Sequence, residues 1–208
     1  MKTRHALPVM VALLFSAAAD AADAPPTEPP TAPPTFLRGV VSAIDNDSVT
    51  LTLASGESRR LALAPDCRVS VLKPIELAKI QPGSFIGSAE MPQKNGTGRS
   101  LEVHVFPPGV KAGEGHYAWD LKPGSMMTNG TVGKVVAKHR GLQLEVAYPN
   151  GHRRMIVPRG TPIVEITPGE PAMIKVGIAV FAIVGKAADG SDIVGGLSIG
   201  ENGATPPM

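Results

Sequence analysis

The residues best suited to bind a metal ion gather between residues 107 and 128, in a stretch rich in Gly and Pro. Glu114 and His116 lie two positions apart, and Met126 and Met127 follow. Imidazole and thioether groups suit copper or nickel. No pair of histidines in the chain has the close His-x-x-x-His spacing of a strong metal motif. The alternative is that His116 is a loop residue hydrogen-bonded to backbone.

The same stretch holds the one Trp of the chain and one of its two Tyr. Tyr117 and Trp119 could form a stacking platform for a ring-bearing ligand, with Asp120 beside them. Alternatively, Trp119 fills the seam between two domains, and we favour this because the chain has few aromatic residues. No catalytic residue is predicted, since no nucleophile or acid–base pair has a placed partner.

The chain on either side of this stretch consists of two similar halves. Residues 39–44 resemble residues 130–135, residues 80–83 resemble 174–177, and the turn at 95–96 resembles that at 189–190. These pairs keep their order and lie 91 to 94 positions apart. The pattern indicates duplication of a unit of roughly 70 residues, which is long enough for a small domain.

Alternating apolar and polar residues predict three strands, a short helical segment and two further strands in each unit. The predicted strands are 39–44, 49–53, 61–63, 84–88 and 101–105, then 130–135, 142–146, 155–157, 178–184 and 193–199, with a short helix at 74–80. This order is that of an OB-type barrel. We therefore expect a mainly β fold of two tandem OB-like five-stranded β-barrels, at 37–106 and 129–201, joined by a Gly/Pro-rich connector at 107–128 and followed by a C-terminal tail at 202–208. Within the first unit, His104 and Glu102 should lie on the solvated face of a strand.

The first 36 residues predict export. Residues 1–19 combine a basic start, an apolar run and small residues, as a secretory signal peptide does, with cleavage after Ala19 or Ala21. A Pro-rich linker at 20–36 should be extended. The apolar run is too short to span a membrane, so we expect a periplasmic or secreted protein with no transmembrane span after signal removal.

The charge of the chain argues against two classes of partner. The 20 Lys and Arg outnumber the 18 Asp and Glu by two, and Lys2 and Arg4 leave with the signal. A formally neutral mature chain favours neither nucleic acid nor an anionic membrane as partner. Cys67 is the only cysteine, which rules out an internal disulfide, and we expect a partly buried thiol at the end of a strand.

A resemblance is carried by GVVSAIDNDSVTLTL, KIQPGSFIG, LEVHVFPPG and GEGHYAWDLKPGSMMTN. Over about residues 37–200, and most densely from 84 to 131, the chain resembles a family of small exported proteobacterial proteins of unknown function with OB-like β repeats. Some members carry an automatic label of metal ABC transporter permease, which conflicts with a chain that has no spanning helix after its signal. The resemblance implies no activity, cofactor or site residue.

Two hypotheses of function follow. The first is an exported, non-enzymatic binding or assembly module that acts in the bacterial periplasm and holds an envelope protein or small ligand through the surface between the barrels. The second is periplasmic handling of copper or nickel through His116. The first needs no cofactor, whereas the second predicts metal binding that is lost in His116→Ala.

Overall fold

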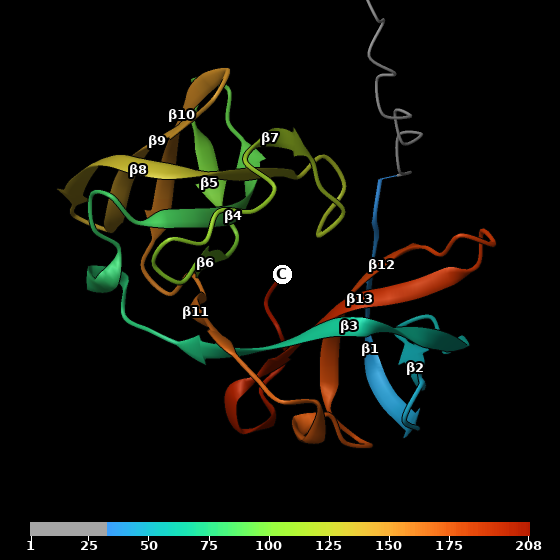
Figure 1. The fold of residues 1–208 in the computed structure, drawn as a ribbon. Helices are drawn as coiled ribbons and strands as arrows, with labels where there is room; N and C mark the ends of the chain where they lie inside the picture. The colour runs from blue at the N-terminus through green and yellow to red at the C-terminus, as the bar shows by residue number, and fades with distance from the viewer. Residues whose placement is uncertain (1–32) are drawn as a thin grey trace, which may run out of the picture. The chain divides into compact units, whose positions relative to one another are not determined.

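A computed structural model describes residues 33–208, which form a mainly β fold, as predicted (Figure 1). The expected signal peptide and most of the expected linker lie outside the described residues. The linker ends earlier than predicted, because strand β1 already begins at Thr35. Within residues 33–208, no helix is long and apolar enough to cross a membrane.

The first barrel is a closed ring of five strands. Its members are β1 (Thr35–Ile44), β2 (Ser48–Leu53), β3 (Ser58–Pro74), β12 (Ala179–Lys186) and β13 (Asp192–Gly200). Strand β1 pairs with β2, β2 with β3, β3 with β13, β13 with β12, and β12 with β1. Only the β3–β13 pair is parallel. This is the strand order of an OB-type barrel.

The second barrel closes in the same way. Its members are β8 (Met126–Lys138), β9 (Gly141–Tyr148), β10 (Gly151–Pro158), β4 (Phe85–Pro92) and β5 (Gly98–Ser100). Strands β8, β9 and β10 take the places of β1, β2 and β3, and β4 and β5 take those of β12 and β13. Three short strands extend it, namely β6 (Val103–Val105), β7 (Gly115–Ala118) and β11 (Ile163–Pro168).

The barrels therefore do not coincide with the sequence repeats, and the predicted domains 37–106 and 129–201 are wrong as domains. Each repeat supplies the first three strands of one barrel and the last two strands of the other. Figure 1 shows the exchange by colour, with red β13 and orange β12 beside blue β1. The predicted connector 107–128 is also corrected, since it joins β6 to β8 within the second barrel and contains β7.

Equivalent hydrogen bonds mark the two exchanged junctions. The amide of Gly177 donates to the carbonyl of Val41 at 2.8 Å, and the amide of Gly83 donates to Val132 at 2.7 Å. Both glycines have φ of +90°, a value that favours Gly at each position. Strands β1 and β8 also carry the same bulge, just after these two valines. The duplicated sequence thus builds the same junction twice, each time with the other repeat's hairpin.

The continuations of the third strands pair with each other. Strand β3 runs beyond the first barrel and pairs antiparallel with β11, which follows β10 of the second barrel. In this pairing Leu72 lies opposite Ile166, 94 positions later, which is the offset of the repeat. An approximate two-fold axis therefore relates the two repeats at this pairing, as it would relate the two subunits of a symmetric dimer.

Each barrel has its own apolar core, as the alternation predicted. Val49 and Leu51 of β2 are fully buried in the first barrel, and Leu144 and Val146 of β9 are fully buried in the second. A third cluster, here called the junction cluster, contains Leu72, Val164, Phe181 and Met208, with Phe36, Trp119 and Ile166 packed against it. Residues of both barrels meet in the junction cluster, which ties them into one body.

Two predictions about segments need correction. The expected helix at 74–80 is a single 3₁₀ turn, η1 (Leu77–Lys79), matched in the second repeat by η2 (Pro171–Met173). Pro and Gly at both ends leave too little chain for an α-helix. The expected tail begins in a third such turn, η3 (Glu201–Gly203), and Met208 is buried in the junction cluster.

The exchange predicts that the first repeat does not fold into a monomer when produced alone. Residues 33–106 contain three strands of one barrel and part of the other, so each set lacks the strands that would close it. Far-ultraviolet circular dichroism and sedimentation of this fragment should show an unfolded or self-associated chain. A folded monomer with a cooperative unfolding transition would mean that each repeat can close on itself.

Candidate functional site

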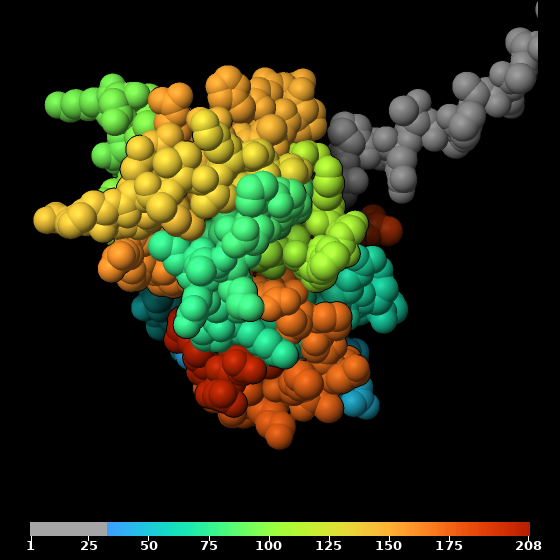
Figure 2. Space-filling model, turned by 90° about the vertical axis from the view of Figure 1, so that its left-hand side faces the viewer, coloured from blue at the N-terminus to red at the C-terminus, as the bar shows by residue number. Residues whose placement is uncertain are grey.

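Exposed basic residues gather on one outer face of the second barrel. OB-type barrels bind ligands on the outer face of their second and third strands, between the turn after strand 1 and the turn before strand 5. Here these are β9 and β10, the β8–β9 turn and the β4–β5 turn. Figure 2 shows both turns, in yellow and green, projecting from the same side. We call this surface the basic face and define it by Lys94, Arg99, Lys134, Lys138, Arg140, Arg154 and Arg159, all exposed.

The strand register sets these residues out in rows. Arg154 lies opposite Glu145, which lies opposite Lys134 on β8. In the next row, Arg99 of β5 lies opposite Ile156 of β10. Because residues alternate between the faces of a strand, side chains at every second position of β10 share the outer face. The neighbours of these residues on β10, Met155 and Val157, are fully buried inside.

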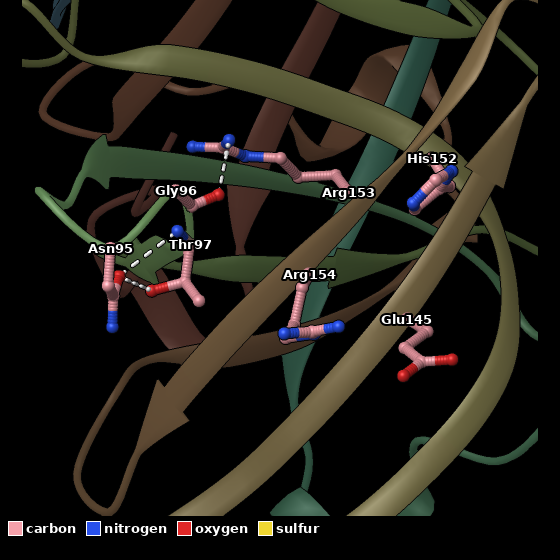
Figure 3. A pocket seen from close by; sticks show the side chains of 7 residues that line it. All are labelled: Asn95, Gly96, Thr97, Glu145, His152, Arg153 and Arg154. Atoms are coloured by element: carbon pink, nitrogen blue, oxygen red, sulfur yellow. Dashed lines mark hydrogen bonds between the residues drawn. The ribbon is translucent and has the colours of Figure 1, made fainter.

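Two clefts open on this face. The first, of about 290 Å³, is lined by Asn95, Gly96, Thr97, Glu145, His152, Arg153 and Arg154 (Figure 3). The second, of about 380 Å³, is lined by Arg99, Arg140, Ile156, Pro158 and Arg159. The turns that carry Arg140 and Arg159 are joined by a hydrogen bond from the amide of Arg159 to the carbonyl of Arg140, at 3.0 Å. Each cleft thus combines arginine side chains with a framework held by backbone pairing.

Arg153 fixes the turn that frames the first cleft. Its Nε lies 2.6 Å from Oε1 of Glu90, and its Nη1 donates to the carbonyl of Gly96 at 3.1 Å (Figure 3). Glu90 is fully buried, and Gly98 leaves room for its carboxylate, since a Cβ there would overlap it. Burial raises the pKa of Glu90, and Arg153 opposes the rise. A buried ion pair therefore anchors the exchanged β4–β5 turn to β10.

The first barrel provides an internal comparison. The pair Arg59–Arg60 lies 94 positions before Arg153–Arg154 in the same strand of its barrel. Arg59 contacts Asp192 at 2.7 Å, and Arg60 contacts Asp45 of the β1–β2 turn at 3.5 Å. Lys186 also contacts Asp192, at 2.6 Å. The equivalent face of the first barrel is thus neutralised by acids.

On the second barrel, Arg153 pairs with Glu90 as Arg59 pairs with Asp192, but the exposed residues of the basic face are not neutralised in this way. None of the seven residues of the basic face forms an ion pair within residues 33–208. Residues 75–160 contain eleven Lys and Arg against six Asp and Glu, and two of these acids, Glu90 and Glu102, are fully buried. The second barrel is therefore strongly basic although the chain as a whole is nearly neutral.

The predicted aromatic platform is an anchor between the barrels. The ring of Trp119 lies 4.5 Å from that of Phe36, between centroids, and packs against the junction cluster. Asp120 forms a two-bond pair with Arg38, at 2.8 and 3.0 Å. The hydroxyl of Tyr117 accepts a hydrogen bond from Asn129 at 3.0 Å. Trp119 thus packs at the junction, as we favoured, and Tyr117 and Asp120 make structural contacts beside it.

The four candidate metal ligands are not brought together as one set. In the β7–β8 register, His116 lies opposite Thr128, and Tyr117 lies opposite Met127. Met127 is buried on the other face of β8 from His116 and Met126. Glu114 is exposed just before β7. No group of three His, Cys, Asp or Glu side chains suited to a metal occurs in the part of the chain that the structure describes.

His116 instead joins a polar cluster at the mouth of the second barrel. Its Nδ1 lies 2.8 Å from Oγ1 of Thr128, and its ring stacks on Tyr148 with 6.3 Å between centroids. Burial, and then the charge of Arg153, lowers the pKa of His116. The surroundings of His116 therefore disfavour its protonated form.

The expectation that Glu102 and His104 are solvated is wrong. Glu102 is fully buried and His104 is 5% exposed. Oε1 of Glu102 accepts from the amide of Ala89 at 2.7 Å, and Oε2 lies 3.1 Å from Nδ1 of His104. Glu102 satisfies a backbone amide at the break between β5 and β6, so a structural need accounts for its burial. Cys67 is partly buried, as expected, and burial raises the pKa of its thiol.

The residues that sequence reasoning missed are Arg99, Arg140, Arg154 and Arg159 as a group. They come from β5, a turn, β10 and a second turn, so no run of sequence shows them together. One signal could have indicated them. Between residues 126 and 160 there are six Lys and Arg and a single acid, Glu145.

Glu90 should make stability depend on pH. Because its pKa is higher in the folded protein than its ordinary 4.5, the folded protein binds the proton more tightly than the unfolded chain does. The contribution of Glu90 to the free energy of unfolding should therefore fall as the pH rises from its ordinary pKa of 4.5 through its raised pKa in the folded protein. Glu90→Gln should lose this part of the fall, as measured by urea unfolding across that range. Glu170→Gln, at an exposed position, is the control, and an equal pH dependence in both variants would contradict the assignment.

Trp119→Ala should destabilise the protein by about 3 kcal/mol, because it removes packing against Phe36 and Phe181. Urea unfolding followed by far-ultraviolet circular dichroism would measure the loss. Val110→Ala, at an exposed position in the same connector, should change stability by less than about 0.5 kcal/mol. Equal effects of the two substitutions would mean that Trp119 does not anchor the connector.

The chain matches no family model, and no curated protein or solved structure is significantly similar to it. Its function must therefore be inferred from its own residues. The clearest indication is that Arg60 of the first barrel has an acidic partner, whereas its equivalent Arg154 and the rest of the basic face form no ion pair within residues 33–208.

Proposed function

We propose that this protein is an exported, non-enzymatic binding module that acts in the bacterial periplasm and holds an anionic ligand on the basic face of its second barrel. The observation that carries this proposal is the set of seven exposed Lys and Arg side chains without acidic partners among the described residues. This surface replaces the one between the barrels that the sequence suggested.

Electrostatics supports an anionic ligand. Unneutralised charges of one sign raise the local concentration of an oppositely charged ligand and speed its association. Arginine in particular binds carboxylate and phosphate groups through two parallel hydrogen bonds. The second cleft contains three arginines, namely Arg99, Arg140 and Arg159, around the apolar side chains of Ile156 and Pro158. A ligand with several anionic groups would meet more than one of them at once.

The proposal includes no catalysis. Glu102 and His104 form the closest carboxylate–imidazole pair among the described residues, and both are buried. A general base must come within hydrogen-bond reach of its substrate. Glu90 is likewise buried and held by Arg153. The exposed residues of the basic face are instead mostly permanent cations, which suit binding.

No described contact favours the alternative function of copper or nickel handling. His116 and Met126 share a face of the sheet, whereas Met127 lies on the opposite face. His116 also uses its Nδ1 in the contact with Thr128. The anionic ligand is therefore the function that the geometry supports best.

Inorganic polyphosphate tests the proposal, because it carries charge without sugar, base or lipid. Calorimetry with the purified protein should show binding that weakens as salt rises from about 0.05 to 0.2 M. The double variant Arg99→Gln/Arg140→Gln should bind about tenfold more weakly. For this variant, the slope of log affinity against log salt concentration should be smaller in magnitude by about one for each lost arginine.

The matched control removes two charges elsewhere. Arg68→Gln/Lys175→Gln changes exposed residues outside the second barrel and should bind as the unaltered protein does. Far-ultraviolet circular dichroism would verify that both variants are folded. No binding by the unaltered protein, or equal weakening in the two double variants, would overturn the proposal.

A further inference from the structure

We infer that the ligand of the basic face is an acidic polysaccharide, a chain of sugar rings that bears carboxylate or other anionic groups at intervals. This inference rests on the proposed function and names the class of ligand. Three features of the surface support an acidic polysaccharide, namely the spacing of the charges, the side chains between the charges, and the kinds of residue that the surface lacks.

The positive charges are arranged around two separate clefts. Arg154 lines the first cleft, whereas Arg99, Arg140 and Arg159 line the second. Both clefts open on the outer side of β10, because Arg154, Ile156 and Pro158 are alternate residues of that strand. The face therefore offers separated anion-binding positions along one strand. This suits an extended chain with anionic groups at intervals.

Hydrogen-bonding side chains lie beside the charges of the first cleft and in the neighbouring row, whereas Ile156 and Pro158 lie between the arginines of the second cleft. Glu145 lies in register between Arg154 and Lys134, Gln143 lies opposite Ile156, and Asn95 lines the first cleft. A carboxylate can only accept hydrogen bonds, so a ligand that donates hydrogen bonds complements Glu145. The hydroxyl groups of a sugar are such donors. A chain of phosphates alone would be repelled by Glu145.

A single-stranded nucleic acid fits the face less well. Proteins that bind single strands stack the bases on aromatic side chains. In residues 33–208, no Phe, Tyr or Trp lines either cleft. The aromatic rings of the second barrel are directed elsewhere, since Tyr148 stacks on His116 at the mouth of the barrel. The bases of a bound strand would therefore lack a platform.

A membrane surface also fits less well. Proteins that lie on membranes insert apolar side chains beside their basic ones. The large apolar side chains that are exposed in the described chain are Val40, Val110, Tyr117, Met173, Val176 and Ile183, and none lines a cleft of the basic face. Ile156 and Pro158 are only partly exposed and line the second cleft among arginines. A concave surface whose apolar side chains lie among arginines, and do not project, favours a glycan over a bilayer.

Calorimetry on the purified protein separates these ligands. The probes are oligomers of polygalacturonate, neutral dextran, a thymidine oligonucleotide of equal charge, and vesicles of phosphatidylglycerol and phosphatidylcholine. Polygalacturonate should bind at least about tenfold more tightly than the oligonucleotide or the vesicles, and neutral dextran should not bind. Arg140→Gln should weaken polygalacturonate binding about tenfold, whereas Arg68→Gln should leave it unchanged.

Glu145→Ala provides the sharpest distinction. Loss of its acceptor should weaken polygalacturonate binding several-fold, and loss of its negative charge should strengthen polyphosphate binding. Glu170→Ala, at an exposed position between β11 and β12, should change neither. Stronger binding of both probes by Glu145→Ala would overturn the inference.

The two proposals fail in different ways. Binding of the oligonucleotide or the vesicles as tight as that of polygalacturonate would overturn the polysaccharide and leave the anion-binding function standing. Absence of binding to polyphosphate and to every charged probe would overturn both.

Discussion

The antiparallel pairing of β3 with β11 is the constraint on which the rest of the structure depends. The chain leaves the first barrel along β3, passes through η1 and enters the second barrel at β4; it returns along β11, through η2, to β12. Each crossing places the last two barrel strands of one repeat in the barrel that the other repeat begins, so neither barrel closes without both repeats. Trp119 and the salt bridge of Asp120 with Arg38 reinforce the same junction from the connector.

The sequence predicted the strands and their order well, because alternation and turn glycines are local signals. It could not predict which repeat's hairpin closes which barrel. Val41 and Val132 offer the same backbone groups, and Gly83 and Gly177 can satisfy either, so both pairings bury equivalent residues. The missed strands β5, β7 and β11 are short and lie beside Gly or Pro, and the predicted strand 101–105 covers only β6. The burial of Glu102 also escaped prediction, since it depends on an amide freed by a break in the neighbouring ladder.

The candidate site was less predictable than the fold, because the net charge of a whole chain does not reveal a basic surface on one of its barrels. Net charge sums over the chain, and here the basic excess of the second barrel is offset partly by the first barrel and partly by Asp20, Asp23 and Glu28. The arginine pairs at 59–60 and 153–154 look alike in sequence. Only the structure distinguishes them, since Asp45 contacts Arg60, whereas Arg154 forms no ion pair within residues 33–208. By contrast, Trp119 could be assigned from composition alone, because a single Trp is most useful as a packing anchor.

The exchanged hairpins also bear on ancestry. Lys94 and Arg99 reach the basic face from the first repeat, whereas Arg140 and Arg154 come from the second, so one unduplicated unit could have built this surface only by pairing with another copy of itself. Such a symmetric dimer would have carried two identical faces, and any change to one would have altered both. Within a single chain that symmetry is not imposed. The two faces differ accordingly, since Asp45 and Asp192 neutralise one while the arginines of the other are exposed.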